Sequence, residues 1–343
     1  MIASIAAPHC IPDGVWRFSC LFFIWGLFMF VSLPVLVSAA PVGGFKAVNF
    51  HFWAPCNMAC GYCFATFDDI RTDLPKGFLP KAEALDVIRA LALAGFEKIN
   101  FVGGEPSTCP WLDDLIDLSC DLGLTVSMVT NGTRIDRNWL NRMAGKLHWL
   151  GLSMDSLTDE TNRRIGRTVN GLPMSAERYA ALCADIHSAG IRLKINTVVN
   201  AFNHGEYLAG FINEAKPERW KIFQALPVAG QNDADFARFR VALGAFGAFV
   251  ARQTEGLHVP AVLVPEDNEA MRDSYAMVDP MGRFFNNATG AHFYSQPILQ
   301  VGALTAFAQV QPSFKKFLAR NGLYDWRLQS RPAHRGNVAE CAS

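Results

Sequence analysis

The alternation of short apolar strands with amphipathic helices between residues 46 and 228 constrains the fold of this chain most. Parallel strands need a crossover connection, so regular alternation predicts one parallel sheet covered by helices. We expect a partial (βα)6 TIM-like barrel over residues 45–228. Strands are expected at 46–53, 98–102, 124–130, 147–154, 191–200 and 219–228, and helices at 81–95, 109–123, 137–145, 175–190 and 204–215.

Polar residues recur on one face of five of these strands. Because side chains alternate across a strand, Lys194 and Asn196 share one face and Ile195 lies on the other. A filled barrel has mostly branched apolar residues inside, so this recurrence predicts a hollow, ligand-filled interior. The alternative is an edge sheet whose polar face meets solvent. The other polar faces comprise Asn49 and His51, Ser127 and Asn131, Ser153 and Asp155, and Arg219 and Lys221.

The two ends of the chain differ from this central region. Residues 229–343 contain one expected helix, near 234–253, and we expect a C-terminal extension that caps the barrel. Residues 1–44 are strongly apolar, with no charged residue from Phe18 to Phe45. About 20 apolar residues span a bilayer. This segment is therefore a membrane anchor with its domain facing the cytoplasm, a cleaved signal peptide, or sequence from an over-long start.

The charge and the cysteine content limit which partners and which cellular compartment we expect. The chain has 31 basic and 31 acidic residues, so no global field recruits nucleic acid or an anionic membrane. Its nine cysteines are an odd number, with three clustered and six scattered, which favours a metal site in a reducing compartment over a disulfide framework. We expect a cytoplasmic protein whose membrane contact, if it has one, is made by the N-terminal segment.

Three cysteines follow the first strand directly, where (βα) barrels carry their chemistry. Cys56, Cys60 and Cys63 have the spacing Cys-x3-Cys-x2-Cys. Structural zinc takes four ligands, usually from two close pairs, and no second pair lies nearby. Iron–sulfur clusters are also held by thiolates, and three thiolates on a four-iron cluster leave one iron free for a small molecule. The alternatives are zinc with His51 as the fourth ligand, and three cysteines without a metal.

This spacing after the first strand of a partial barrel resembles the radical S-adenosylmethionine (SAM) superfamily. In that superfamily the open iron of a [4Fe–4S] cluster binds SAM, and reduction of SAM gives a 5′-deoxyadenosyl radical. "GGEP" at 103–106, after the second strand, resembles the segment that binds the methionine amino group. The resemblance implies the cluster and SAM as cofactors, and an external electron donor such as a flavodoxin or ferredoxin.

Eight ordered segments between about residues 46 and 326 narrow the resemblance to the viperin family, especially its bacterial and archaeal members. Viperins convert a nucleoside triphosphate, CTP in animals, to its 3′-deoxy-3′,4′-didehydro form by abstracting the ribose 4′ hydrogen. The resemblance implies a lyase of antiviral defence that makes an RNA chain terminator from CTP, UTP or GTP. The segments are "VNFHF", "KINFVGGEP", "VSMVTNG", "LSMDS", "IGR", "KINTVVNAFN", "RWKIFQ" and "DSYAMVDPMGRFFN".

The resemblance also implies roles for individual residues. Arg167 matches the arginine that pairs with the SAM carboxylate, and Tyr275 matches a tyrosine proposed as a hydrogen donor. The structural alternatives are a surface turn for Arg167, a helix cap for Asn131, and core packing for His51 and Tyr275. Further SAM contacts are implied for Gly103, Gly104, Glu105, Asn131, Ser153, Asp155 and Ser156, and nucleotide contacts for Asn49, His51, Lys194, Asn196, Arg219 and Lys221.

Three of these residues give an independent reason to expect a polyanion. Lys194, Arg219 and Lys221 lie on neighbouring expected strands, with their side chains on the polar faces. In a cavity of reduced dielectric, three such cations repel one another strongly unless an anion joins them. Ordinary solvated charges are the alternative.

The chain departs from the family in places, and other functions compete. Val102 stands where a serine often precedes GGEP, and the chain runs on past "FLARNGLYDW" instead of ending near a tryptophan. Because of the second departure, it is in doubt whether this chain has the C-terminal surface that binds partners in the family. The competing functions are a radical SAM enzyme acting on a peptide, a molybdopterin-type nucleotide cyclase, and a membrane-tethered scaffold with a structural cluster. The first two usually carry extra C-terminal cysteines, whereas only Cys341 follows Cys183 here.

Overall fold

The computed structural model divides the chain into two compact units. These units are Met1–Ala40 and Pro41–Ser343. Within them the structure describes residues 9–10, 16–24, 27–34 and 44–326.

The first unit contains a small antiparallel sheet. Its strand β2 (Trp16–Ile24) pairs with β3 (Leu27–Pro34), and β1 (His9–Cys10) pairs with the start of β2. None of the helices among the described residues has the length and apolarity to cross a membrane. The prediction of an anchor, a signal or an over-long start for residues 1–44 lies partly outside the described residues.

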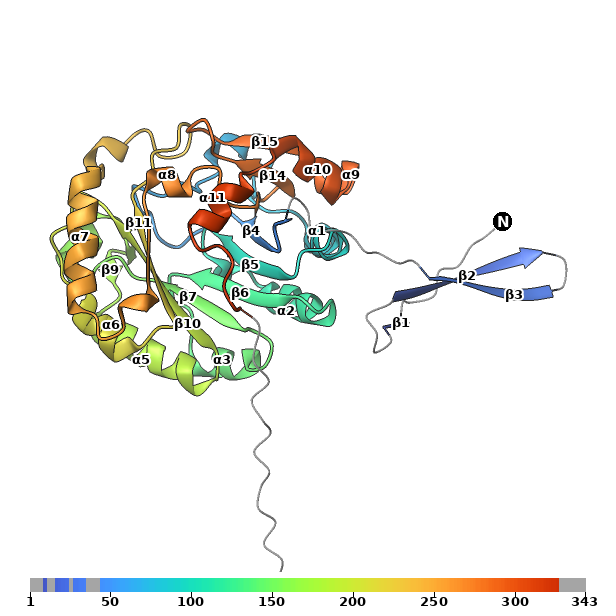
Figure 1. Cartoon of the computed structure of the whole chain (residues 1–343), viewed down its shortest axis with the longest axis horizontal. Coiled ribbons are helices and arrows are strands. Elements are labelled where there is room, and N and C mark those ends of the chain that lie inside the picture. The colour runs from blue at the N-terminus through green and yellow to red at the C-terminus, as the bar shows by residue number, and fades with distance from the viewer. Residues whose placement is uncertain (1–8, 11–15, 25–26, 35–43, 327–343) are drawn as a thin grey trace, which may run out of the picture. The chain divides into compact units, whose positions relative to one another are not determined.

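The second unit is built on one curved ten-stranded sheet (Figure 1). Six of its strands follow the same order along the chain and across the sheet, and every neighbouring pair among them is parallel. This arrangement confirms the expected partial barrel. The six strands are β4 (Ala47–Trp53), β5 (Lys98–Gly103), β6 (Thr125–Thr130), β7 (Trp149–Ser153), β10 (Arg192–Val199) and β11 (Arg219–Gln224).

Helices run along the outer side of this sheet in Figure 1. Four of the expected helices form within a few residues of their predicted bounds, and the Ser175 hydroxyl oxygen caps one of them by accepting from the Arg178 N–H at 3.3 Å. A short helix, α4 (Asp159–Arg164), and the hairpin β8–β9 (Thr168–Val169 and Leu172–Pro173) were not predicted. The barrel helices are α1 (Lys81–Leu93), α2 (Leu112–Asp121), α3 (Arg137–Met143), α5 (Ala176–Ser188), α6 (Ala209–Ala215) and α7 (Leu243–Gly256).

Two expected helices begin later than predicted. Helix α6 begins at Ala209 because the Gln253 side-chain oxygen accepts from the N–H groups of Leu208 and Ala209, at 2.8 and 3.0 Å. Helix α7 begins nine residues after the predicted start, since Phe236 and Phe239 turn inward into a buried cluster. Tertiary packing therefore overrides local helix propensity at both positions.

The C-terminal extension adds strands to both edges of the same sheet. Strand β12 (Leu263–Glu266) pairs with β11, and β13 (Met277–Val278) pairs with β4. Both pairs are parallel, so the extension lengthens the barrel wall on either side. The remaining elements are β14 (Arg283–Asn286), β15 (Phe293–Pro297), α8 (Asn268–Met271), α9 (Ile298–Val301), α10 (Ala303–Val310) and α11 (Phe314–Ala319).

Strand β10 shows how the sheet divides core from cavity. Leu193, Ile195 and Val199 are fully buried against the helices, whereas Lys194 and Asn196 alternate with them on the inner face. The inner side chains of the six strands line a common cavity. The prediction that these polar faces line a hollow interior is confirmed.

Candidate active site

One cavity of about 680 Å³ lies inside the barrel, within the range of small-molecule sites. The structure brings almost every predicted site residue to its wall. Ser156 is the exception, because it is fully buried and its hydroxyl donates to Glu206 at 2.8 Å. The lining includes Asn49, His51, Cys56, Cys60, Cys63, Gly103, Gly104, Glu105, Asn131, Ser153, Asp155, Arg167, Lys194, Asn196, Arg219, Lys221 and Tyr275.

The three cysteines lie in the loop after β4, at one end of the cavity. Cys56 is exposed and Cys60 and Cys63 are half-buried, and all three are free thiols. Burial raises the pKa of Cys56 to about 11 and that of Cys63 to about 12. Without a metal these thiols are protonated, whereas a coordinating metal deprotonates its thiol ligands. Among the residues that the structure describes, no three His, Cys, Asp or Glu side chains gather closely enough to hold one metal ion.

A turn at Ile165 and Gly166 holds this loop in place. The N–H of Ala59 donates to the Gly166 carbonyl at 3.2 Å, and the N–H of Gly61 donates to the Ile165 carbonyl at 3.3 Å. A Cβ on Gly166 would lie 2.0 Å from the Ala59 carbonyl oxygen, and its φ is +80°. Only glycine satisfies both conditions.

The GGEP segment packs against the cysteine loop at the end of β5. The N–H of Gly104 donates to the Trp53 carbonyl at 2.6 Å, and the N–H of Glu105 donates to the Pro55 carbonyl at 2.9 Å. A Cβ on Gly104 would lie 2.2 Å from the Ala54 carbonyl oxygen. The glycine allows a close approach of two protein backbones, in addition to the ligand approach that the sequence indicated.

The Glu105 carboxylate is fully engaged by the protein. It accepts from the backbone and hydroxyl groups of Ser107 at 3.0 and 2.6 Å, from the Thr130 hydroxyl at 2.5 Å, and from the Asn131 N–H at 2.7 Å. Asn131 in turn donates from its side chain to Asn57 in the cysteine loop at 2.8 Å. The carboxylate therefore ties the ends of β5 and β6 together.

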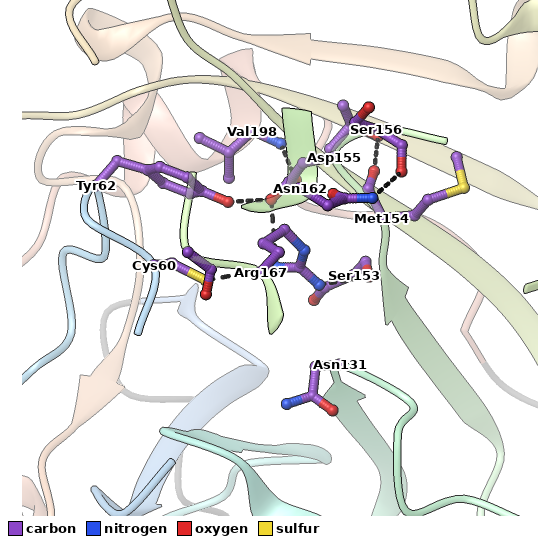
Figure 2. A network of polar contacts seen from close by, with 12 residues as sticks. Cys60, Tyr62, Asn131, Ser153, Met154, Asp155, Ser156, Asn162, Arg167 and Val198 are labelled. Carbon is purple, nitrogen blue, oxygen red and sulfur yellow. Dashed lines mark hydrogen bonds and ion pairs between the residues drawn. The ribbon is translucent and has the colours of Figure 1, made fainter. Parts of the chain in front are cut away.

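Arg167 is the centre of a buried polar network beside the loop (Figure 2). Its guanidinium donates to the Ser153 carbonyl at 2.7 Å, pairs with Asp155 at 3.2 Å and approaches the Cys60 sulfur at 4.0 Å. The Tyr62 hydroxyl also donates to Asp155, and burial together with that carboxylate raises the pKa of Tyr62. Nε of Arg167 is buried without a hydrogen-bond partner in the described structure.

These features fit the cofactors that the motif implies. Three thiols suit an iron–sulfur cluster, and Arg167 retains an unpaired cationic N–H for an additional acceptor. The zinc alternative fits less well, because the His51 ring packs against Phe64, Phe67 and Phe285. Burial lowers the pKa of His51 to about 3, so this histidine is neutral.

Cations gather on the opposite wall, on β10 and β11. Burial is the main cause that lowers the pKa of Lys194 to about 8 and that of Lys221 to about 7, and neighbouring cations add to it. Gly151 makes room for this wall, since a Cβ there would lie 2.9 Å from Cε of Lys194. Asn196 adds an Oδ1 that is buried without a partner in the described structure. The cations therefore lower one another's pKa in the cavity, although Glu266 opposes this shift at Lys221.

Sequence reasoning missed two further cations in this lining. Lys98, on β5, donates to the Tyr324 hydroxyl at 2.7 Å, and burial lowers its pKa to about 7. It shares the inner face with Asn100, so the period-2 pattern of "KINFV" contained the signal. Arg320 reaches the cavity from just after α11, with its guanidinium carbon 3.5 Å from the Tyr275 ring centre. No periodic pattern marked Arg320.

Amides line the remaining wall, on β4 and β5. The Ser127 hydroxyl donates to Asn100 Oδ1 at 2.7 Å, and Asn100 Nδ2 donates to Asn49 Oδ1 at 2.9 Å. This chain of hydrogen bonds fixes the orientation of both amides. Asn49 consequently offers its own N–H groups to the cavity.

The sequence of this chain is similar to that of known proteins. Residues 52–208 match the Radical SAM superfamily. The chain is 46% identical over 287 residues to an S-adenosylmethionine-dependent nucleotide dehydratase of Lacinutrix mariniflava, covering 83% of this chain and 60% of that protein. It is 45% identical over 282 residues to a protein of the same name from Flammeovirga pacifica, covering 82% and 96%.

A solved structure shares the fold at low sequence identity. Streptococcus suis SuiB bound to its precursor peptide SuiA superposes with a TM-score of 0.58 at 15% identity, covering 81% of this chain and 67% of that one. This likeness supports the partial-barrel architecture.

Proposed function

The chain belongs to the S-adenosylmethionine-dependent nucleotide dehydratase family within the radical SAM superfamily, and from this membership we propose its reaction and its substrate. The substrate is a nucleoside triphosphate, and the product is its 3′-deoxy-3′,4′-didehydro form. The reaction removes the ribose 4′ hydrogen and the 3′ hydroxyl. The product is an antiviral chain terminator.

The observation that carries this proposal is the division of one cavity into two walls. The cysteine loop and Arg167 line it at the ends of β4 and β7, whereas Lys194, Arg219 and Lys221 line it from β10 and β11. Lys194, Arg219 and Lys221, here called the cation wall, favour the binding of a polyanion. The shared cavity brings that polyanion beside the cofactor site. A peptide substrate has no general need for such a wall.

The cofactor end is held by residues of this chain. As a radical SAM enzyme the protein uses a [4Fe–4S] cluster and SAM, which supply the electron and the hydrogen-abstracting chemistry when bound. Cys56, Cys60 and Cys63 would hold the cluster. Arg167 and the backbone of residues 103–104 would orient the carboxylate and amino groups of SAM. Ser153 and Asp155 support Arg167 from behind.

The nucleotide end orients the substrate and excludes water. Lys194, Lys221 and Arg219 bind the phosphate oxygens, which relieves the repulsion among the three cations. Asn49 presents N–H donors to the ribose or base. Tyr275, whose hydroxyl accepts from Lys221 at 2.7 Å, is the hydrogen donor late in the reaction.

Side-by-side incubation with each nucleotide tests the proposal. Anaerobically reconstituted protein, dithionite and SAM are incubated with CTP, UTP, GTP or ATP, and the products are followed by mass spectrometry. We expect 5′-deoxyadenosine to form only with a nucleoside triphosphate, together with a nucleotide that is lighter by one water. SAM cleavage that ignores every nucleotide but responds to peptides would overturn the proposal.

The electron donor and the compartment belong to the same proposal. Cys56 is exposed, so the cluster loop is open to a docking flavodoxin or ferredoxin. Free thiols and an oxygen-sensitive cluster require a reducing compartment, which indicates the cytoplasm. Residues 18–45 remain the candidate membrane contact. Replacing dithionite with a flavodoxin and its reductase, and fractionating cells, test these two points.

A further inference from the structure

Glu266, the last residue of β12, lies directly behind the cation wall. Its side chain is fully buried and contacts three residues that line the cavity. Lys221 Nζ lies 2.5 Å from one carboxylate oxygen, and Arg320 Nη1 lies 3.6 Å from the same oxygen. The Tyr275 hydroxyl donates to the other oxygen.

The charge of Glu266 opposes the binding of an anion to this wall. Although burial disfavours ionisation, Lys221 and Arg320 lower the pKa of Glu266, so the carboxylate is ionised. A buried carboxylate next to two cations offsets part of their field in the cavity. Phosphate oxygens that approach Lys221 therefore compete with Glu266 for it.

The same carboxylate fixes the position of Tyr275. The Tyr275 hydroxyl donates to Glu266 and accepts from Lys221 at 2.7 Å, while Arg320 covers the ring face at 3.5 Å. Arg320 is itself anchored by two hydrogen bonds to the Ser274 carbonyl, at 2.9 and 3.0 Å. Removing the carboxylate would leave the tyrosine hydroxyl without its acceptor.

We propose that Glu266 is a positioning residue with two separable effects, one on nucleotide affinity and one on the orientation of Tyr275. Its negative charge weakens the hold of Lys221 and Arg320 on phosphate, which keeps nucleotide and product exchangeable. Its second oxygen accepts from the Tyr275 hydroxyl and so fixes the position of Tyr275 in the cavity wall. This inference rests on the proposed function, because both effects are exerted on a bound nucleoside triphosphate.

Two substitutions separate these effects. Glu266→Gln removes a charge that also raises the pKa of Lys221, so binding is measured at a pH low enough to keep Lys221 protonated. Because glutamine keeps an oxygen acceptor of the same reach, the dissociation constant for the preferred triphosphate should there fall several-fold. Glu266→Asp keeps the charge but withdraws the acceptor by one methylene. In that variant the dissociation constant should stay near the wild-type value, while the yield of dehydrated nucleotide per 5′-deoxyadenosine falls several-fold.

Two further variants serve as controls. Glu269→Gln makes the same chemical change three residues along the chain, where the side chain is exposed and pairs with Lys316 at 2.6 Å, and should leave both quantities unchanged. Tyr275→Phe should reproduce the lost product yield of Glu266→Asp without altering affinity. Thermal unfolding with and without nucleotide keeps the test valid for a destabilised variant, since each variant is compared with itself. The rise in Tm caused by the nucleotide should be larger in Glu266→Gln than in the wild type.

The outcomes distinguish this inference from the proposed function. If the wild-type enzyme cleaves SAM without regard to nucleotides, the proposed function fails. If the wild type is active but both Glu266 variants bind nucleotide more weakly to the same degree, Glu266 has only a structural role and the inference fails. Unchanged affinity and unchanged product yield in both variants would also overturn it.

Discussion

Arg167 shows how one buried side chain joins two parts of the site. It contacts the cysteine loop through Cys60 and the end of β7 through the Ser153 carbonyl, and it pairs with Asp155. The planar guanidinium reaches these partners in different directions at once. A lysine ammonium at the same position would be a single point charge.

We therefore expect Arg167→Lys to weaken SAM binding by about tenfold or more, because hydrogen bonds to charged groups contribute about 1.5–3 kcal/mol. Equilibrium binding of SAM to cluster-loaded protein measures the effect. Arg163→Lys is the matched control, since Arg163 is exposed and pairs only with Asp159 among the contacts described, at 3.0 Å. Equal SAM affinity in the two variants would remove Arg167 from the SAM site.

The buried lysines predict a dependence of nucleotide affinity on pH. Lys221 has a pKa of about 7 and Lys194 of about 8, both lowered chiefly by burial, so the free cavity loses positive charge as the pH rises through this window. A bound triphosphate favours the charged form and raises both pKa values. Binding should therefore take up protons above pH 7, and affinity should fall from pH 7 to pH 9.

Calorimetry in buffers of different ionisation enthalpy measures that proton uptake. The unphosphorylated nucleoside is the control, since it lacks the anion that reprotonates the lysines. A nucleotide affinity that rises with pH, or that releases protons on binding, would contradict phosphate contact with Lys194 and Lys221.

The alternation of residues along the strands predicts part of this site. Alternation across strands placed Lys194 and Asn196 on one inner face, and the structure confirms that placement. Glu266 had no such signal, because it lies in a short edge strand that no periodic pattern marked. The partners that Glu105 has on β6 and just after it were also hidden, since Thr130 and Asn131 lie 25 and 26 residues away in the sequence.

At the scale of elements, the turn after α4 determines where the cysteine loop sits. Gly166→Ala would place a Cβ 2.0 Å from the Ala59 carbonyl oxygen and strain a φ of +80°. We expect the variant to lose most of its cluster, measured as iron and sulfide per protein after anaerobic reconstitution. The loop would have to move away from the turn to relieve the contact.

Gly171→Ala is the matched control for this variant. Gly171 has a similar φ of +79°, but no atom lies within 4 Å of the position of an added Cβ. Backbone strain alone would affect both variants equally, at about 1–2 kcal/mol. If Gly171→Ala loses iron to the same extent as Gly166→Ala, close packing of the turn against the loop is not what holds the cysteines.

The elements of the barrel were largely predictable, because each carries its own period, and α3 and α5 also have side-chain caps from Asp136 and Ser175. The extension was not, because its strands are short and pair with β4 and β11 over long sequence separations. The late starts of α6 and α7 follow from Gln253 and Phe236, whose partners are distant in the sequence. Contacts of this kind leave no local periodic signal.

At the scale of the whole molecule, one curved sheet creates one cavity with two chemically distinct ends. The thiols follow β4, three of the cations lie on β10 and β11, and the extension closes the space with Tyr275, Arg320 and Tyr324. Neither end alone specifies the reaction. Both groups of residues line the same cavity.

Transfer of the ribose 4′ hydrogen tests this central claim most directly. The preferred nucleoside triphosphate, deuterated at C4′, is incubated with the reduced holoenzyme and SAM, and the 5′-deoxyadenosine is analysed by mass spectrometry. We predict that 5′-deoxyadenosine gains one deuterium in each turnover. Formation of 5′-deoxyadenosine without deuterium, alongside a dehydrated nucleotide that retains its label, would contradict the account.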